Sequence, residues 1–374
     1  MKYHIQTKNG MINRGNWNRI KECMRRAREG KEITTGFLGG SITQGSLSSK
    51  PETCYAYLVY EWWKEKFPQS KVKFINAGIG GTTSQFGVSR VEDHLLKYEP
   101  DFMLIEFAVN DENTEFFEET YEGLIRKSYG NCCKPAVLLM NNVKYDDGLN
   151  ADEMHLKIAK AYQLPMVSMK ATIWPEIENG RIERSEITPD NLHPNDEGHA
   201  LVAKVITDFL ERIYEEIDKE EEEAFADGKL PKPVTANAYE NSIRYQNGNS
   251  TPKLEGFEPD TEPQSDIRDI FRNGWTAAHE GDKISFDIAC TGIAVQYRKS
   301  VKQPTPVARV IVDGREKDAV VLDGNFEEDW GDCLYIDTIT RHMEPGTHKV
   351  EICITEAHEN DVVPFYLVSV IGSE

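Results

Sequence analysis

A serine near the start of the chain and a histidine far along it have the side chains needed for nucleophilic catalysis. Ser41 follows two glycines in the stretch FLGGSITQG, and His193 follows Asp190 by three residues in TPDNLHPNDEGH. A serine nucleophile needs a base to take its proton, and the base needs an acceptor to orient its ring. In a loop, the spacing of Asp190 and His193 lets the carboxylate accept from one ring nitrogen while the other nitrogen faces the serine.

Each of these residues also has a plainer interpretation. Ser41 alone is more typical of a turn or a helix cap than of a nucleophile, and the G-x-S-x-G motif is absent because residue 43 is Thr. Asp190 and His193 can be ordinary loop residues. A metal site is a further alternative, because acidic residues and histidines lie close together here: His193, Asp196, Glu197 and His199. The H-E-x-x-H motif and a second ligand cluster are both absent, so we expect no metal and no other cofactor, and we expect His199 to pack locally in a helix.

Two further segments have groups that can donate to a developing oxyanion. The glycines of NAGIGGTTSQFG, residues 76–87, let a backbone N–H approach a ligand closely. The stretch FAVND, residues 107–111, offers the side-chain amide of Asn110. Either segment by itself can be an ordinary turn between a strand and a helix. The four segments together, each after a successive element of the pattern, are hard to ascribe to chance.

The elements that position these segments alternate between strands and helices from about residue 15 to residue 215. Strands are predicted over 32–39, 71–78, 101–109, 135–143 and 164–169, and helices over 17–28, 54–67, 89–98, 116–129, 151–163 and 196–217. This alternation predicts an α/β domain with a parallel sheet covered on both faces, in three layers. Ligands bind such sheets at the carboxyl ends of the strands, which is where the four segments fall.

The pattern changes after an acidic helix end and a Gly- and Pro-containing stretch, which we interpret as a linker over residues 226–236. Seven short β-rich runs follow without a helix between them, and they predict an antiparallel β-sandwich over residues 237–374. Asp-Gly pairs at 313–314 and 323–324 are typical of hairpin turns. We therefore expect an α/β domain over residues 1–225 and a β-sandwich after the linker.

The order GGSIT, NAGIGGTTS, FAVND, DNLHP resembles the four sequence blocks of SGNH (GDSL-type) hydrolases over roughly residues 30–215. The resemblance implies that Ser41 is the nucleophile, that His193 is the general base and then the acid, and that Asp190 orients His193. It also implies an oxyanion hole formed by the backbone N–H groups of Ser41 and Gly81 and by the side chain of Asn110.

One residue departs from the family pattern, because Gly40 stands where the motif that names the family has Asp. The substitution leaves Ser41 in place. The adjacent glycines Gly80 and Gly81 leave open which of the two supplies the backbone donor.

An SGNH domain followed by a β-sandwich resembles bacterial carbohydrate esterases of the acetyl-mannan esterase type, in which a jelly-roll module similar to a carbohydrate-binding module accompanies the hydrolase. The resemblance implies a serine esterase that removes O-acetyl groups from acetylated oligosaccharides, such as manno-oligosaccharides. Candidate sugar contacts are Trp330, Asp329 and Glu328 in the loop GNFEEDWGD, and Trp174 before the Asp190 loop. The alternative for both tryptophans is that they pack within the fold.

The amino-acid composition of the chain limits the classes of binding partner that we expect. The chain has 43 Lys and Arg against 63 Asp and Glu, a formal net charge of −20, which disfavours nucleic acid and anionic membranes as partners. No apolar stretch is typical of a signal peptide or a membrane helix. Seven cysteines without framework spacing indicate reduced thiols and a cytoplasmic protein.

Two other functions stay open: an acyl-hydrolase acting on lipids or thioesters, and a non-catalytic carbohydrate-binding protein.

Overall fold

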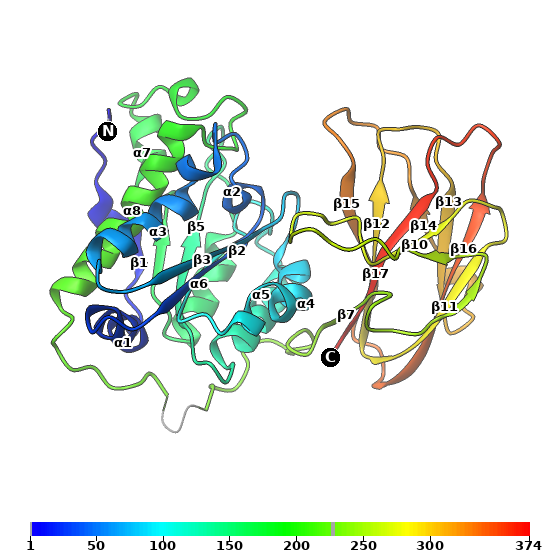
Figure 1. Ribbon diagram of the computed structural model, residues 1–374, viewed down its shortest axis with the longest axis horizontal. Helices are drawn as coiled ribbons and strands as arrows, with labels where there is room; N and C mark the ends of the chain where they lie inside the picture. The colour runs from blue at the N-terminus through cyan, green and yellow to red at the C-terminus, as the bar shows by residue number, and fades with distance from the viewer. Residues whose placement is uncertain (1, 226–228) are drawn as a thin grey trace. The chain divides into compact units, whose positions relative to one another are not determined.

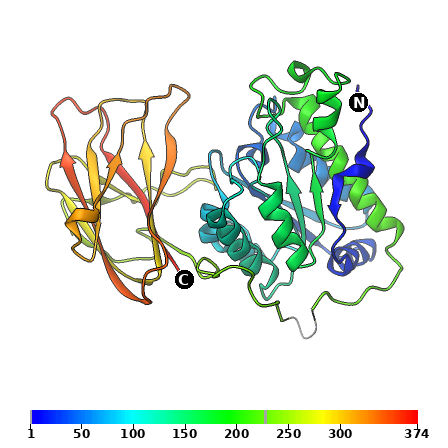
Figure 2. The ribbon, with the colours of Figure 1, turned by 180° about the vertical axis from the view of Figure 1, so that it is seen from behind.

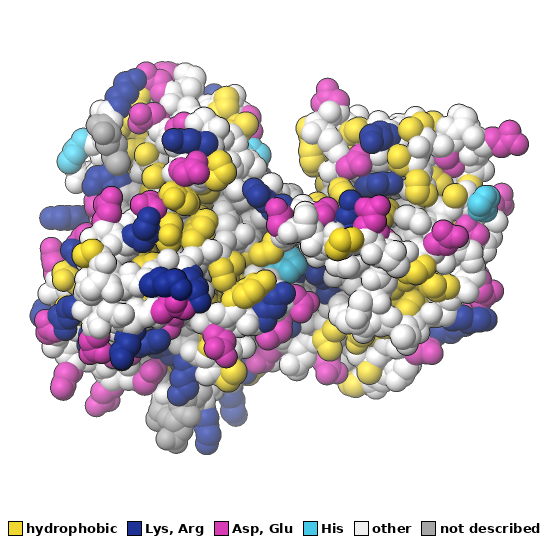
Figure 3. Space-filling view, in the orientation of Figure 1, with side chains coloured by type: hydrophobic (Ala, Val, Ile, Leu, Met, Phe, Trp, Pro, Cys, Tyr) yellow, Lys and Arg dark blue, Asp and Glu magenta, His cyan; other side chains and the backbone are white. Residues whose placement is uncertain are grey.

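The computed structural model describes residues 2–225 and 229–374, and the chain divides into two compact units between Asn237 and Ala238 (Figure 1). Each unit has its own hydrophobic core. Acidic side chains are spread over the visible face of both units and do not gather in one patch (Figure 3).

The first unit is built on a six-stranded sheet with the order β1-β6-β5-β4-β2-β3. Its strands are β1 (Met11–Asn13), β2 (Ile33–Gly39), β3 (Val72–Gly78), β4 (Phe102–Glu106), β5 (Ala136–Asn141) and β6 (Met166–Ser168). The five predicted strands are all present and parallel. Strand β1 was not predicted; it pairs antiparallel with β6 at the sheet edge, and three residues are too short for a periodic signal. Strands β2, β4 and β5 are buried along their whole length, which explains their near-continuous apolar sequences.

Helices cover both faces of this sheet, as expected (Figures 1 and 2). They are α1 (Asn18–Arg28), α3 (Tyr55–Lys66), α4 (Ser84–His94), α5 (Glu115–Tyr129), α6 (Asp152–Ala161) and α8 (Asp196–Glu215), with short helices α2 (Ser41–Gln44) and α7 (Ile173–Glu178). Helices α1 and α3 pack against α8, whereas α5 packs against α4 and α6. These two groups form the outer layers of the three-layer domain.

The end of the first unit is bound by two side chains of α5, Glu122 and Arg126. Residues 226–228 of the predicted linker lie outside the described residues. Beyond them, Glu122 on α5 accepts the backbone N–H groups of Val234 and Thr235, each at 2.8 Å. Arg126 on the same helix donates to the carbonyl of Pro231 at 2.9 Å. These bonds attach the described part of the linker to the α/β unit.

The second unit contains two antiparallel sheets, with the orders β15-β12-β17-β10-β9 and β14-β13-β16-β11-β8, and β7 pairs with β17. The strands are β7 (Ile243–Tyr245), β8 (Lys253–Glu255), β9 (Glu258–Pro259), β10 (Trp275–Ala277), β11 (Lys283–Cys290), β12 (Gly292–Lys299), β13 (Val307–Val312), β14 (Val320–Asp323), β15 (Cys333–Thr340), β16 (Gly346–Glu356) and β17 (Phe365–Ser373). The seven β-rich runs correspond to β11 through β17, so the prediction of an antiparallel β fold is confirmed.

The Asp-Gly pairs do not form the expected two-residue hairpins. Asp313 and Gly314 both have positive φ, 52° and 68°, but the connection from β13 to β14 runs over residues 313–319. Asp323 ends β14, and the chain then crosses to β15 in the other sheet. An Asp-Gly pair predicts a turn in the chain. It does not show whether the next strand joins the same sheet or the other sheet.

Candidate active site

Three of the predicted segments meet at one edge of the first sheet. Strand β2 is paired on one side with β3 and on the other with β4, and Gly39 lies level with both Gly78 and Glu106. Because the three strands are parallel, their carboxyl ends lie side by side. The residues that follow these ends, which include Ser41, Gly81 and Asn110, are therefore neighbours in space.

Ser41, His193 and Asp190 form a continuous chain of hydrogen bonds. His193 Nε2 lies 2.7 Å from Ser41 Oγ, and His193 Nδ1 lies 2.6 Å from Asp190 Oδ2. Since a carboxylate only accepts, Nδ1 carries a proton, and in the neutral ring Nε2 is left to accept the serine proton. Ser41 is 7% exposed. The arrangement lets the serine lose its proton to a base whose tautomer is set by Asp190.

The loop around Asp190 explains how a spacing of three residues places these groups together. Asp190 Oδ1 accepts the backbone N–H groups of Leu192 and His193, at 3.0 and 2.7 Å. Asn191 adopts a left-handed conformation with φ of 68°, which Asn tolerates better than most residues. Burial acts to raise the pKa of Asp190, but the hydrogen bonds from the ring and backbone of His193 hold that pKa below its usual value. Asn195 then caps α8, accepting from the N–H of Gly198 at 3.1 Å.

The two adjacent glycines after β3 differ in their hydrogen bonding. The N–H of Gly80 donates to Gln44 Oε1 at 2.6 Å. Gly81 has φ of 68°, and a Cβ added there would meet nothing within 4 Å. No protein acceptor for its N–H is found in residues 2–225 and 229–374. The N–H of Gly81 is therefore available to a ligand, whereas that of Gly80 is occupied by Gln44.

Asn110 packs directly against the residue that precedes Ser41. A Cβ added at Gly40 would lie 2.6 Å from Asn110 Oδ1. The amide of Asn110 consequently fits in this position because residue 40 has no side chain. A side chain at residue 40 would require the Asn110 amide to move.

Asp196 and His199 lie on α8 but bind the segment after Ser41. The carboxylate of Asp196 accepts from Ser49 N–H and Oγ, at 2.7 and 2.6 Å, and from Thr53 Oγ1 at 2.6 Å. His199 Nδ1 lies 3.3 Å from the backbone nitrogen of Tyr55, and burial lowers the His199 pKa to about 4. No group of three or more His, Cys, Asp or Glu residues suited to a metal is found in the described part of the chain.

Arg90 on α4 was missed in the sequence. Its guanidinium is buried and donates to the carbonyls of Gly39 at 3.0 Å and Ala77 at 2.7 Å. It thereby ties together the ends of β2 and β3 just before Ser41 and Gly81. A buried arginine and an exposed one look alike in a helical sequence, so no local signal could have identified it.

The predicted sugar contacts belong to both units. Trp174, on α7 of the first unit, is partly buried against the core of that unit. In the second unit Trp330 is 61% exposed, and its ring stands edge-on to Phe326 with centroids 5.0 Å apart. Glu328 accepts from the indole N–H of Trp330, and Asp329 is exposed. Trp330 is therefore not a core residue of the sandwich.

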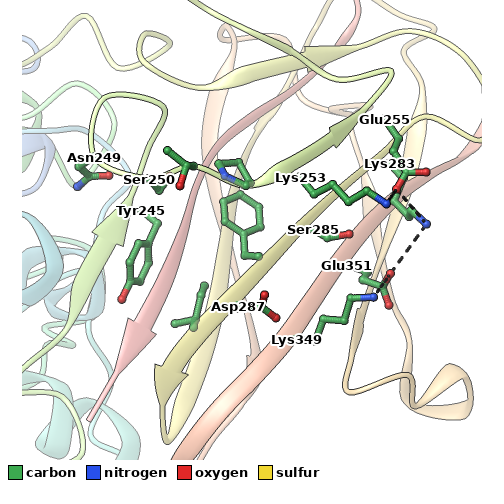
Figure 4. Close-up of a pocket in the computed structure, with 14 residues that line it drawn as sticks. Tyr245, Asn249, Ser250, Lys253, Glu255, Lys283, Ser285, Asp287, Lys349 and Glu351 are labelled. Carbon is green, nitrogen blue, oxygen red and sulfur yellow. Dashed lines mark hydrogen bonds and ion pairs between the residues drawn. The ribbon is translucent and has the colours of Figure 1, made fainter.

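The second unit also contains a hollow of about 540 Å³, lined by β8, β11, β16 and the segment from Tyr245 to Pro252 (Figure 4). Its charged groups largely pair with one another. Lys253 lies 2.9 Å from Glu255, and Lys349 lies 2.9 Å from Glu351. The paired charges leave the hollow without a strong preference for an anion or a cation.

A buried carboxyl group lies beneath the site at the end of β4. Glu106 Oε1 accepts the N–H of Ala108 at 3.1 Å, and Oε2 has no hydrogen-bond partner among the described residues. Burial, together with the nearby charge of Asp111, raises the pKa of Glu106 to about 8. Glu106 therefore keeps its proton at neutral pH.

This proton makes the stability of the fold depend on pH. In the unfolded chain Glu106 titrates near its ordinary value of 4.5 and in the folded chain at about 8, so the free energy of unfolding should fall as pH rises between these values. Glu106→Gln is neutral at every pH, so its free energy of unfolding should lack this dependence on pH. As pH rises from 4.5 to 8, the free energy of unfolding of the variant minus that of the wild type should increase by about 3 to 5 kcal/mol. The measurement is urea unfolding at a series of pH values. The exposed control Glu29→Gln should follow the wild type, and parallel curves for Glu106→Gln and the wild type would contradict the prediction.

Comparison with known proteins identifies the family. A sequence model described as the GDSL-like Lipase/Acylhydrolase family matches residues 37–201. A solved two-domain esterase active on acetylated mannans, co-crystallised with mannopentaose, is 58% identical to this chain, with a TM-score of 0.94 over 100% of this chain and 99% of its own. This chain belongs to the GDSL-like lipase/acylhydrolase family. It is accordingly a carboxylic ester hydrolase.

Other known proteins resemble the chain in whole or in part. A second structure of a two-domain esterase active on acetylated mannans is also 58% identical, with a TM-score of 0.96 over 99% of each chain. Thioesterase 1/protease 1/lysophospholipase L1 of Escherichia coli K12 is 24% identical over 175 residues, which are 44% of this chain and 77% of that protein. Within the described residues, no helix is long and apolar enough to cross a membrane.

Proposed function

We propose that this chain is a serine esterase that removes O-acetyl groups from acetylated manno-oligosaccharides through an acyl-enzyme on Ser41. The hydrogen-bonded chain from Ser41 through His193 to Asp190 supports the chemistry. The 58% identity to esterases active on acetylated mannans, over the whole chain, supports the substrate class.

In this reaction Ser41 Oγ attacks the acetyl carbonyl while its proton moves to His193 Nε2. Asp190 stabilises the imidazolium that forms. The tetrahedral intermediate collapses when His193 gives this proton to the sugar oxygen, which leaves as a hydroxyl group. His193 then activates a water molecule that attacks the acetyl-Ser41 ester, and acetate is released.

The negative oxygen of each intermediate is held by three donors in this proposal: the backbone N–H groups of Ser41 and Gly81 and the side-chain amide of Asn110. Gly81 is preferred to Gly80 because the N–H of Gly80 already donates to Gln44. Asn110 suits the role because its Oδ1 faces Gly40, which leaves its Nδ2 to point elsewhere. Donors fixed in this way need no reorganisation when charge develops.

The substrate can be tested with a panel of acetylated mannan and xylan oligosaccharides, a lysophospholipid and an acyl thioester. Acetate release should be fastest from acetylated manno-oligosaccharides and should be absent in Ser41→Ala. A second candidate, an acyl-hydrolase for lipids or thioesters, is favoured by the similarity to the Escherichia coli thioesterase and lysophospholipase. Faster turnover of the thioester or the lipid would support that candidate instead.

We further propose that the second unit is a carbohydrate-binding-module-like domain. In this proposal Trp330 stacks on a sugar ring, with Glu328 and Asp329 accepting sugar hydroxyls. Trp174 is proposed separately as a sugar contact of the first unit. An indole 61% exposed to solvent has a free face for such stacking.

The role of Trp330 predicts a difference between two substrates. Trp330→Ala should lower kcat/KM on acetylated oligosaccharide by roughly fivefold, corresponding to an aromatic contact of about 1 kcal/mol. It should leave hydrolysis of p-nitrophenyl acetate unchanged, because that ester has no sugar. Val321→Ala, which also truncates an exposed side chain of the second unit, should change neither rate. Equal losses on both substrates for Trp330→Ala would indicate a packing role.

A further inference from the structure

Asp111 lies immediately after Asn110, and both of its carboxylate oxygens have hydrogen-bond partners inside the fold. The side chain of Asp111 is buried. Its Oδ1 accepts the backbone N–H of Ser84, the first residue of α4, at 2.9 Å. Thr83, which precedes the helix, makes no capping bond with its own side chain. Asp111 therefore caps α4 from a distant part of the chain, and its negative charge suits the amino end of a helix.

The other carboxylate oxygen of Asp111 faces a buried histidine. His155 Nε2 lies 3.1 Å from Asp111 Oδ2, and His155 Nδ1 lies 3.1 Å from Asn141 Oδ1. The orientation of Asn141 is set by its amide group, which donates to Asp152 Oδ1 at 2.7 Å. Each ring nitrogen of His155 therefore lies within hydrogen-bond distance of a side-chain oxygen, one from the Asp111 carboxylate and one from the Asn141 amide. It stacks on Tyr121 with ring centroids 3.6 Å apart.

These contacts join the two loops that carry the oxyanion donors. Asp111 is bonded covalently to Asn110, and Ser84 is three residues beyond Gly81. The turn that contains Gly81 is closed by Thr82 Oγ1, which donates to the carbonyl of Ile79 at 2.7 Å. A single carboxylate therefore links the turn of Asn110 to the end of the glycine loop.

We propose that Asp111 and His155 are positioning residues that hold Asn110 and the Gly81 loop at the separation required to bind the oxyanion. Hydrogen bonds to a carboxylate are shorter and stronger than bonds between neutral groups, so Asp111 restricts both loops more tightly than a neutral side chain would. Neither residue touches the substrate. The inference rests on the proposed role of Asn110 in the oxyanion hole.

Asp111→Asn tests this role because the variant has nearly the same shape. Its amide oxygen can still accept from Ser84, and its NH₂ group can donate to His155 Nε2 when that nitrogen carries no proton. The fold should therefore persist while the negative charge of residue 111 is lost. Thr120→Val is a matched control, since it removes the hydrogen bond of 2.7 Å between Thr120 Oγ1 and Ser84 Oγ at the same helix start, together with the bond of 3.3 Å from Thr120 Oγ1 to the carbonyl of Phe117.

The measurement is hydrolysis of p-nitrophenyl acetate, with active serines counted by an organophosphonate. We expect Asp111→Asn to lower kcat at least tenfold per active serine and to change KM less than twofold. Thr120→Val should change kcat less than twofold. In an Asn110→Ala background, the effect of Asp111→Asn should shrink at least threefold, because the donor that it positions is gone.

Two outcomes would overturn the proposal: an unchanged kcat in Asp111→Asn, or the same fold-loss in both backgrounds. If Asp111→Asn does not fold, His155→Gln is tested in the same two backgrounds with the same criteria. Failure of the proposed oxyanion role of Asn110 is distinguishable, since Asn110→Ala alone would then leave kcat unchanged, and failure of the proposed function would appear as turnover in Ser41→Ala. A lowered kcat in Asn110→Ala with an unaffected Asp111→Asn would overturn the positioning role only.

Discussion

Ser41→Ala is expected to abolish turnover of acetyl esters while the protein stays folded. The variant has no nucleophile, so no acyl-enzyme can form, and the loss in kcat should be on the order of 10⁶, as found when such a serine is removed from another serine hydrolase. The stability should change little, because the substitution removes one oxygen whose side-chain hydrogen-bond partner is His193. A net hydrogen bond contributes about 1 kcal/mol.

The measurements are p-nitrophenyl acetate hydrolysis, thermal unfolding and mass spectrometry of the rapidly quenched enzyme. The wild type should show an acetylated peptide that contains Ser41, and the variant should not. Ser70→Ala is a matched control, because it removes an exposed serine hydroxyl that binds the carbonyl of Lys31 and should keep full activity. Near-normal turnover by a folded Ser41→Ala protein would refute the acyl-enzyme on this residue.

Asn110→Ala should produce the second largest effect, a loss of about 10²–10³ in kcat, or roughly 2.7–4 kcal/mol of transition-state stabilisation. KM should change little, because the donor acts on charge that develops only in the transition state. Asn110→Asp keeps the shape but replaces the NH₂ donor with a negative oxygen, so its loss should be at least as large.

Asn113→Ala provides the control for this substitution. Asn113 lies in the same loop, where its amide donates to the carbonyl of Asn150 at 2.9 Å and its oxygen accepts from Met154. We expect this control to lower the thermal stability without lowering kcat per active serine. If Asn110→Ala instead raised KM and left kcat unchanged, Asn110 would be a substrate-binding residue with no special role in the transition state.

The sequence by itself determined the fold class and the local chemistry. Strands such as β2 are buried on both faces, so they appear as short apolar runs between amphipathic helices, and this alternation predicted the α/β unit correctly. The Asp190 and His193 contact could also be anticipated, because both residues lie in one loop and are three positions apart. In each case the interaction lies within one segment of the chain, so the spacing and periodicity of residues in that segment are enough to predict it.

The tertiary structure alone decided how the segments meet. Gln44 occupies the N–H of Gly80 and leaves that of Gly81 free, although the two glycines are equivalent in the sequence. Helix α4 begins at Ser84, five residues before its predicted start, because Asp111 caps it from another strand end. These hydrogen bonds join residues tens of positions apart, so no local periodicity records them, and they exist only once the sheet has brought its strand ends together.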